Sequence, residues 1–340
     1  MNETTRYILF MNMEMTRKRG EMYRSIRSWL DERGYLEVFT PSLSTHLIPE
    51  HSIANFSTRY LSEFRPSKEL YLIPSPEVFM KQILREYQHN IYQISTCFRN
   101  DEQIGDHHNP EFTMLEYYTV GADDEDSIAI TEELLRETSL KGTREHALPP
   151  FRRMSVAEAC MQYAGVDLLK TQRVGDLRQA ALNLGLTLPP LPETWEETFH
   201  RIFLTFVEPN LPQDKPLVLT DYPSQIDTLA KKVPGKPYRR RWEMYIAGVE
   251  IANCYDEELE GDTVRAFYEK EYAILCEQRG RDGSVIPDID YSFAELFDGH
   301  FPQASGVAMG LDRLLMVQTG ATSLRDLILF RGSDMMKHYY

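Results

Sequence analysis

Two runs of β-branched and aromatic residues, "IYQISTCFR" (91–99) and "EFTMLEYYTV" (111–120), constrain the fold of this chain more than any other stretch. A polar interval rich in Asn, Asp, Gly, His and Pro separates them, which is the pattern of a long β-hairpin. Because side chains two apart in a strand share a face, Phe112, Glu116 and Tyr118 are predicted to point the same way. Flat rings beside a carboxylate fit either an exposed amphipathic hairpin or a binding surface, and the spacing alone leaves both open.

Helix and strand patterns precede this hairpin. Between residues 16 and 33 the apolar side chains recur at helical spacing, so a helix is predicted there. The stretch "YLEVFTPSLS" (35–44) is predicted to be a strand that Pro41 interrupts, because proline cannot donate to a sheet ladder. A further helix is predicted to begin near Pro76, which places Glu77 in its first turn.

Residues from about 141 to 235 differ from the rest, because they carry short helical patterns and no cluster of catalytic residue types. We interpret them as a helical insertion in a sheet. Strand patterns return at "RWEMYIAGVEIANCY" (241–255), and "SGVAMGLDRLLMVQTG" (305–320) is predicted to be a strand that runs directly into a helix. The other helices predicted after the hairpin are 128–138, 155–164, 174–185, 193–206 and 262–279.

Length and charge narrow the class of protein. The chain has 340 residues, so one large domain with insertions and two domains are both open. Its formal net charge of −15 argues against general binding to nucleic acid, which depends on neutralising phosphates. The basic segment "KKVPGKPYRRRW" (231–242) stands out against this background, either as a solvated loop or as a docking patch for an acidic partner.

The sequence predicts a cytoplasmic protein without a membrane partner. No apolar run approaches the roughly 20 residues that span a bilayer, and the first residues lack the pattern of a signal peptide. The cysteines show no C-x-x-C spacing, so free thiols are expected rather than disulfides or a zinc site. These cysteines are Cys97, Cys160, Cys254 and Cys276.

The segment "WEMYIAGVEIAN" carries two acids in an apolar hairpin. A two-residue Ala-Gly turn would pair Tyr245 with Glu250, which places Glu250 and Glu243 on one face with Cα atoms about 7 to 8 Å apart. Two such acids are costly without a cation, so Mg²⁺ binding is favoured over a solvated face. Strict alternation pairs Glu243 with Ala252 and turns Asn253 the other way, unless a bulge re-aims it.

The closing strand-to-helix segment predicts an anion site. Gly306 and Gly310 permit close approach of the backbone, and Arg313 lies in the first turn of the predicted helix. Backbone amides at a helix N-terminus and a guanidinium together suit a polyphosphate. Arg99 before a polar loop, a pair of acids for Mg²⁺ and Arg313 together indicate a nucleotide site.

The chain resembles a known family in its motifs. "FRND…HHNPEFTMLEYY" and "SGVAMGLDRLLM" resemble motifs 2 and 3 of class II aminoacyl-tRNA synthetases, in the variant of the lysyl-tRNA synthetases, and "RGYLEVFTPSL" resembles motif 1. The resemblance implies an α+β fold with an antiparallel sheet flanked by helices. It also implies a single catalytic domain over residues 1–340, with the insertion at about 141–235. The motif 1 helix starts near Thr16, so the N-terminal OB anticodon-binding domain of lysyl-tRNA synthetases is not expected.

This compact layout is similar to that of the elongation factor P lysine ligases, which activate lysine or (R)-β-lysine with ATP and attach it to a lysine of elongation factor P. The resemblance implies that Arg99 and Arg313 are catalytic, with Arg99 at the α-phosphate and Arg313 at the γ-phosphate. It implies that Phe112 stacks on adenine and that Asp101 or Glu102 reads the adenine amino group. The ATP site so implied is Arg99, Asp101, Glu102, His107, His108, Phe112, Glu243, Glu250 and Arg313.

The resemblance also implies how Mg²⁺ and the amino acid are held. Glu243 and Glu250 are implied as the ligands of Mg²⁺. Glu116 and Tyr118 are implied to reach the side-chain ammonium of the substrate, and Glu77 to hold the amino group near the reacting carboxyl. The substrate pocket so implied is Glu77, Glu116, Tyr118, Asn253, Glu257 and Ala308.

Some positions depart from the lysyl-tRNA synthetase pattern. Asp101 replaces the usual glutamate, and His107 stands where those enzymes place an arginine. Cys254 stands where relatives have glycine. Ala308 occupies a motif 3 position that is glycine in the synthetases and alanine in the ligases, so it favours a ligase.

The resemblance makes a homodimer the expected assembly, because residues 16–43 would form a helix and a broken strand like those of the family's two-fold interface. A tRNA partner is not expected, given the negative net charge and the missing OB domain. Three functions remain open: an ATP-dependent protein-lysine ligase, a truncated enzyme that acylates tRNA or another amine, and an inactive regulatory paralogue. The retained acids and arginines argue against the last and favour the ligase.

Overall fold

The computed structural model describes residues 13–100, 105–189, 193–282 and 285–330. The helices are α2 (Met13–Glu32), α3 (Glu77–Tyr87), α4 (Asp124–Thr138), α5 (Val156–Ala164), α6 (Val174–Asn183), α7 (Trp195–Ile202), α8 (Gly261–Asp282) and α9 (Leu311–Thr319). The strands are β1 (Leu36–Glu37), β2 (Leu43–Ser44), β3 (Ser57–Tyr60), β4 (Lys68–Leu72), β5 (Ile91–Phe98), β6 (Glu111–Val120), β7 (Arg152–Ser155), β8 (Leu217–Thr220), β9 (Tyr222–Pro223), β10 (Tyr238–Arg239), β11 (Arg241–Ile246), β12 (Val249–Asp256) and β13 (Ala304–Gly310). Within these described ranges, no helix is long and apolar enough to cross a membrane.

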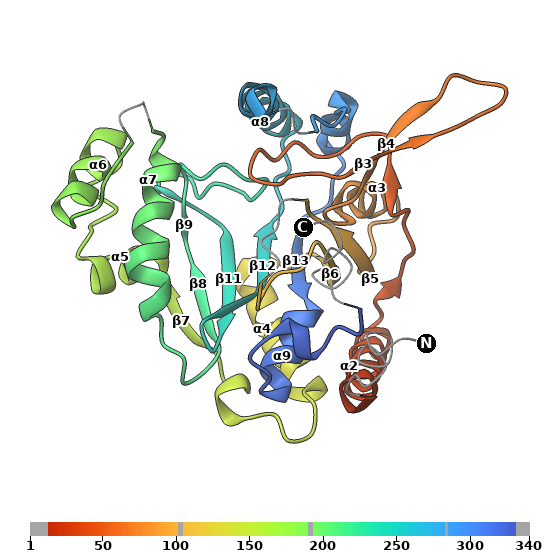
Figure 1. Ribbon diagram of the computed structural model, residues 1–340, viewed down its shortest axis with the longest axis horizontal. Coiled ribbons are helices and arrows are strands. Elements are labelled where there is room, and N and C mark those ends of the chain that lie inside the picture. The colour runs from red at the N-terminus through yellow and green to blue at the C-terminus, as the bar shows by residue number, and fades with distance from the viewer. Residues whose placement is uncertain (1–12, 101–104, 190–192, 283–284, 331–340) are drawn as a thin grey trace, which may run out of the picture.

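An eight-stranded sheet forms the centre of the fold (Figure 1). Its order is β1-β5-β6-β13-β12-β11-β8-β7. Neighbouring strands are antiparallel, except for the parallel pairs β1–β5 and β7–β8 at the two edges. Helices α2, α4 and α9 pack on one face, and α3 and α8 pack on the other. The predicted α+β class, with a sheet flanked by helices, is confirmed, although both edges are parallel rather than antiparallel.

The predicted hairpin at 91–120 is confirmed as β5 and β6. Leu115 and Tyr117 are fully buried in the core beneath α2 and α4. Because side chains alternate along a strand, Glu116 and Tyr118 then lie on the opposite face, between the sheet and α3. Glu116 is only 3% exposed, so the hairpin carries a carboxylate into the interior rather than to solvent.

The predictions for the N-terminal half are confirmed in their main features. Helix α2 ends where expected, with Gly34 at φ +78° two residues later, and α3 begins directly after Pro76. Around Pro41 the predicted strand divides into β1 and β2, which belong to different sheets. Helix α4 begins four residues earlier than predicted, because Asp123 and Asp126 form a capping box at its start.

The segment 141–235 holds α5, α6 and α7 and also two strands of the central sheet that the helical patterns did not predict. Strand β8 pairs with β11, and β7 lies beyond it at the edge. Apolar side chains of the helices pack on these strands in a core cluster of their own, which includes Trp195, Phe199 and Leu217. The segment 141–235 therefore extends the sheet instead of projecting from it.

The basic segment 231–242 divides into two parts in the structure. Lys232 and Lys236 are exposed beside a turn, as the solvated-loop alternative expects, whereas the other four cations pair with carboxylates of the molecule. Arg239 is 2% exposed and donates to the carbonyl groups of Thr228 and Ala230. Four cations of the segment pair with carboxylates of the same chain. The pairs are Lys231–Asp256, Arg239–Asp227, Arg240–Asp124 and Arg241–Glu243.

Trp242 joins β11 to helix α4 and provides a test of this packing. Its indole is 1% exposed and donates to the carbonyl of Asp124 at 3.1 Å and to Oγ of Ser127 at 2.8 Å. Trp242→Phe keeps an aromatic ring but removes that donor from the dry interior. We expect the free energy of unfolding to fall by about 1–3 kcal/mol in urea denaturation. An unchanged unfolding midpoint would show that these bonds contribute no net stability.

Candidate active site

The β11–β12 hairpin contains a β-bulge that shapes the site. Tyr245 lies opposite Glu250 as predicted. Beyond that pair the register shifts by one residue, so Glu243 lies opposite Asn253, and the predicted pairing of Glu243 with Ala252 is wrong. The extra residue turns Ala252 into the core and brings Asn253 to the face of the two glutamates.

A cavity between the sheet and α3 gathers acidic side chains, and we call it the carboxylate cavity. It lies on the face opposite α2, α4 and α9, and strands β6, β12 and β13 contribute to its wall. All six residues of the predicted substrate pocket line it, from four separate elements. They are Glu77, Glu116, Tyr118, Asn253, Glu257 and Ala308. Glu50, Ser75, Arg99 and Tyr255 complete the polar part of the wall.

A fully buried ammonium organises this cavity. Lys81 is 0% exposed, and its Nζ lies 2.5 Å from Oε1 of Glu77 and 2.8 Å from Oε2 of Glu257. The hydroxyl of Tyr118 donates to Oε1 of Glu116 at 2.7 Å. Sequence reasoning missed Lys81, although its position one helical turn after Glu77 in α3 was a usable signal.

The cavity holds more negative charge than its cations neutralise. Burial, followed by the charge of Glu77, raises the pKa of Glu116 to about 8. Burial raises the pKa of Glu257 to about 7 in spite of Lys81, and burial with Glu77 raises that of Glu50 to about 7. These pKa values indicate a pocket in which a bound cation would stabilise the ionised carboxylates.

Gly306 lets β13 approach these side chains closely. A Cβ atom at this position would lie 2.5 Å from Oε1 of Glu257 and 2.6 Å from Cε1 of Tyr118, so a side chain does not fit. The prediction of close approach is confirmed for Gly306. It is wrong for Gly310, where a Cβ would make only ordinary contacts at 3.8 Å and beyond.

A second cavity adjoins the first and carries the arginines, and we call it the arginine cavity. Arg99, Met114, Asn253 and Ala308 line both cavities. The guanidinium of Arg99 lies 5.3 Å from the ring centroid of Phe112, and its Nε is buried without a hydrogen-bond partner among the described residues. A buried cationic donor with an unused N–H is suited to an anion.

Arg313 lines the arginine cavity and is held by two hydrogen bonds. Its Nε donates to the carbonyl of His107 at 3.0 Å, and its Nη1 donates to the carbonyl of Glu250 at 3.0 Å. These bonds connect the start of α9 to the loop before β6 and to β12. The residues of the predicted ATP site that line this cavity are Arg99, His107, His108, Phe112, Glu250 and Arg313. The predicted Asp101 and Glu102 lie outside the described residues.

Glu243 and Glu250 share a face but differ in their surroundings. Glu243 is 8% exposed, and its carboxylate accepts hydrogen bonds from Arg241 at 2.5 Å, from the hydroxyl of Tyr245 at 2.8 Å and from that of Tyr222. Glu250 is half-buried and faces the arginine cavity. Burial, and then the charge of Glu243, raises the pKa of Glu250 to about 7.

This donor set fits an Mg²⁺ ion that arrives with a nucleotide. No three His, Cys, Asp or Glu side chains gather as a metal site in the part of the chain that the structure describes. Mg²⁺ is usually bound by one or two carboxylates together with phosphate oxygens and water. Of the two carboxylates, that of Glu250 is the more exposed to solvent, with 39% of its side chain accessible against 11% for Glu243.

Comparison with known proteins shows the family of this chain. The family model for tRNA synthetases class II (D, K and N) matches residues 3–333. The chain belongs to this family. Its members and the relatives described next are ligases, so this class II chain is an enzyme.

Two kinds of class II relative are similar over most of the chain. Lysine–tRNA ligase of Moorella thermoacetica is 35% identical over 92% of this chain, which spans 64% of that relative's length. Elongation factor P–(R)-beta-lysine ligase of Vibrio vulnificus is 32% identical over 94% of this chain and 96% of the relative. The ligase of the same name from Pectobacterium atrosepticum is 31% identical, over 97% of this chain and 98% of the relative. The chain therefore spans less than two thirds of the lysine–tRNA ligase and nearly all of the elongation factor P ligases.

The raised pKa of Glu116 predicts a pH-dependent penalty on stability. Between its ordinary value near 4.5 and about 8, the folded state binds more protons at Glu116 than the unfolded state does, so this group destabilises the fold as pH rises. Relative to Glu116→Gln, the unliganded wild type should lose at least ~1 kcal/mol of unfolding free energy between pH 5.5 and 8.5. Urea denaturation across this range measures the difference, with Glu111→Gln on the exposed start of β6 as control. Parallel pH curves for wild type and Glu116→Gln would contradict the buried-charge description.

Proposed function

We propose that this enzyme activates lysine or (R)-β-lysine with ATP as the aminoacyl adenylate and transfers the aminoacyl group to a lysine side chain of elongation factor P in the cytoplasm. The observation that carries the proposal is the group of carboxylates around the buried Lys81. The carboxylate cavity that they line adjoins the arginine cavity, and Arg99 lines both. A cation-binding pocket joined to an anion-binding pocket is what a diamino acid and a nucleotide require.

The charge of the carboxylate cavity supports a substrate with two ammonium groups. Glu50, Glu77, Glu116 and Glu257 carry four formal negative charges, against one on Lys81 and one on Arg99. A diamino acid brings two ammonium groups and one carboxylate. In our assignment Glu116 and Glu257 hold the distal ammonium, with the Tyr118 hydroxyl orienting Glu116.

At the reacting end, positioning and charge stabilisation account for the first step. A carboxylate oxygen of the amino acid attacks the α-phosphorus of ATP, the new O–P bond forms and pyrophosphate leaves. Arg99 is placed to contact both reacting groups because it lines both cavities, and Glu77 holds the neighbouring amino group. Phe112 offers a flat ring to adenine, and Arg313 binds the terminal phosphate. Bound Mg²⁺ would be held by Glu250 and Glu243 and would neutralise phosphate charge.

The identity of the acceptor is supported by the relatives. The chain aligns with elongation factor P–(R)-beta-lysine ligases over 94–97% of its own length and 96–98% of theirs. Ala308 lines the cavity at the position that favours a ligase. Transfer to tRNA is the second candidate, because the lysine–tRNA ligases are 33–35% identical to this chain, against 31–32% for the elongation factor P ligases. The net charge of −15 disfavours tRNA, since binding to its backbone depends on cations.

Amino-acid-dependent pyrophosphate exchange tests the proposal. We expect exchange with lysine or (R)-β-lysine, and Glu116→Gln should lower kcat/KM for that substrate by about tenfold to a hundredfold, because a charge-assisted hydrogen bond in the interior is lost. Norleucine, which lacks the distal ammonium, is the matched substrate control and should show no parallel loss. Exchange with no cationic amino acid, or equal losses for cationic and neutral substrates, would refute the assignment.

We further propose a homodimer through α2 and β1. Three large apolar side chains after α2 are exposed: Leu36 (55%), Phe39 (83%) and Leu43 (41%). Strand β1 also forms an edge of the central sheet, where a second copy could pack. Light scattering at micromolar concentration should give the mass of a dimer, and Phe39→Asp should shift the equilibrium to monomer. A fully active wild-type monomer would contradict the proposal.

A further inference from the structure

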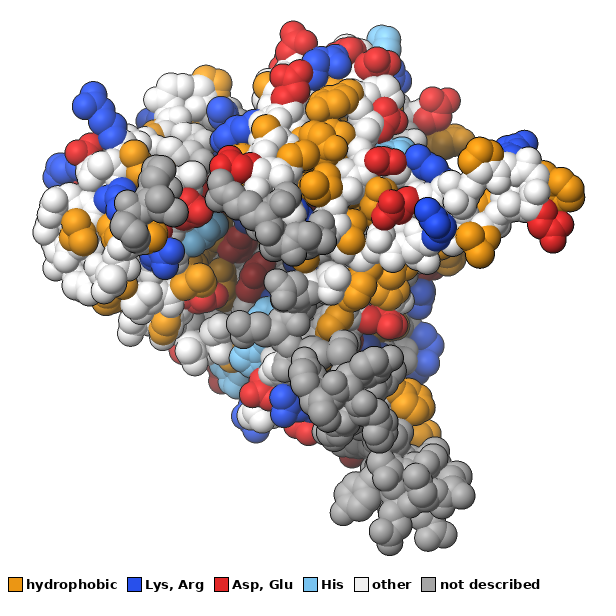
Figure 2. Space-filling model, turned by 45° about the horizontal axis from the view of Figure 1, so that its top comes forward, with side chains coloured by type: hydrophobic (Ala, Val, Ile, Leu, Met, Phe, Trp, Pro, Cys, Tyr) orange, Lys and Arg blue, Asp and Glu red, His pale blue; other side chains and the backbone are white. Residues whose placement is uncertain are grey.

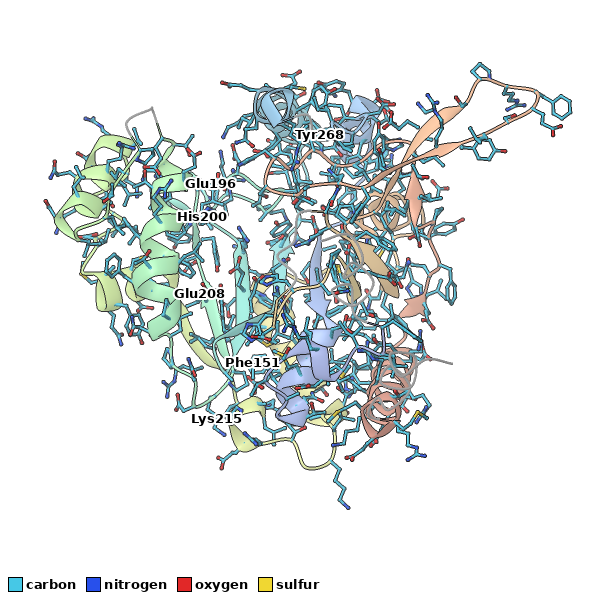
Figure 3. All side chains as sticks on the ribbon, viewed as in Figure 1. Phe151, Glu196, His200, Glu208, Lys215 and Tyr268 are labelled. Carbon is cyan, nitrogen blue, oxygen red and sulfur yellow. The ribbon has the colours of Figure 1, made fainter. Side chains whose placement is uncertain are left out.

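A third cavity, which we call the side cavity, adjoins the carboxylate cavity and is not used by the adenylation step. It lies between the loop 48–52, helix α7, the segment 226–229 and helix α8. Glu50, Glu77 and Tyr255 line both cavities, so they form a shared wall. Figure 3 shows Glu196 and His200 on the side of α7 that faces the sheet, and acidic and histidine side chains lie in the hollow of Figure 2.

The side cavity carries carboxylates that the fold leaves unpaired. Glu50 and Glu196 accept no side-chain hydrogen bond from the described residues, although both are partly buried. Glu271 is 5% exposed and accepts from the backbone N–H of His51 at 3.2 Å and from its Nδ1 at 2.7 Å. Burial raises the pKa of Glu196, although the charge of His51 opposes this effect and that of Glu271 adds to it.

The cations that line the side cavity are engaged with carboxylates. His51 pairs with Glu271, whose hydrogen bond raises the pKa of the imidazole. Arg241 donates to Glu243 and stacks over the ring of Tyr222, 4.4 Å from its centroid. Asp227 is neutralised by Arg239 and Lys270. The negative charge left over is therefore that of Glu50 and Glu196, because Glu271 is paired with His51.

The shared wall places this charge next to the reacting carbonyl. In the proposed function Glu77 holds the amino group beside the carboxyl that becomes the adenylate, and Glu77 also lines the side cavity. A long side chain that enters past Glu196 would thus reach the adenylate from the side of Glu50. An ammonium at the end of an aliphatic chain matches a narrow acidic passage that leads to an electrophile.

We propose that the side cavity admits the acceptor lysine side chain of the protein substrate, with its ammonium guided by Glu196 and delivered to Glu50 at the shared wall. This inference rests on the proposed function. The amine nitrogen attacks the carbonyl carbon of the adenylate, the C–N bond forms, and the C–O bond to phosphate breaks as AMP leaves with the electron pair. Of the two protons that the ammonium gives up, one passes to Glu50 and the other to the departing AMP.

Glu50 is suited to accept a proton in this position. Together with Glu77 it is one of the two carboxylates that line both cavities, and Glu77, Arg99, Glu271 and Lys81 are the charged groups that act on it. Burial and the neighbouring Glu77 raise its pKa to about 7, so it can take a proton near neutral pH.

Separating adenylation from transfer tests the proposal. Adenylation is measured by pyrophosphate exchange, and transfer by single-turnover consumption of the preformed enzyme-bound adenylate. The acceptors are elongation factor P and, as a small probe, Nα-acetyl-L-lysine methylamide. Glu196→Gln should raise the acceptor concentration for half-maximal transfer about tenfold, because one charged partner of the ammonium is lost. Glu196→Lys should raise it further, while pyrophosphate exchange stays within about twofold of wild type for both variants.

Two further variants sharpen the test. Glu269→Gln removes an exposed carboxylate of α8 that does not line the side cavity, so it should change neither step. Glu50→Gln, supplied with chemically prepared adenylate, should lower the maximal transfer rate about a hundredfold with acceptor binding retained.

The outcomes distinguish this inference from the proposed function. Transfer at the wild-type rate and acceptor dependence in both Glu196 variants would overturn the side cavity as the entrance. Parallel loss of exchange and transfer would also overturn it, because Glu196 would then act in adenylation. If the wild type forms no adenylate with lysine or (R)-β-lysine, or neither acceptor consumes the adenylate, it is the proposed function that fails.

Discussion

The buried ammonium of Lys81 is the interaction on which the site depends. It lies between Glu77 on α3 and Glu257 at the end of the β12 segment, with no exposure to solvent. Removing three charged groups from water is tolerable only when each is paired at short distance, so α3 cannot shift away from the sheet without leaving a charge unpaired. Gly306 completes the arrangement, because a side chain at that position would collide with Glu257 and Tyr118.

The same arrangement leaves the cavity with an unbalanced charge. Lys81 neutralises part of the acidic set, yet the pKa values of Glu50, Glu116 and Glu257 remain raised to about 7 or 8. A fold selected only for stability would replace such carboxylates with apolar or neutral side chains. Their retention next to Arg99, whose Nε has no partner among the described residues, is typical of a site prepared for a charged ligand.

Much of the candidate site follows from strand alternation. The spacing of β6 predicts that Glu116 and Tyr118 share a face, and the helix starting after Pro76 predicts Glu77 in its first turn. Other residues belong to the candidate site only because segments far apart in the sequence come into contact. Lys81 and Glu50 carry no motif, and they enter the site because α3 and the loop 48–52 pack over β12 and β13. Strands β7 and β8 were missed for the same reason, since their pairing partners lie elsewhere in the chain.

The sequence by itself determined the α+β class, the two hairpins, the strand-to-helix segment at 304–319 and the family, because local periodicity and short motifs are carried by neighbouring residues. Tertiary structure alone decided the bulge that turns Asn253 toward Glu243, the different surroundings of Glu243 and Glu250, and the use of the basic segment 231–242 in internal ion pairs. Each of these depends on which charged or polar group finds a partner once the chain is compact. Burial sets the energy of an ion pair and the choice of partner, and burial is a property of the packed molecule rather than of any stretch of sequence.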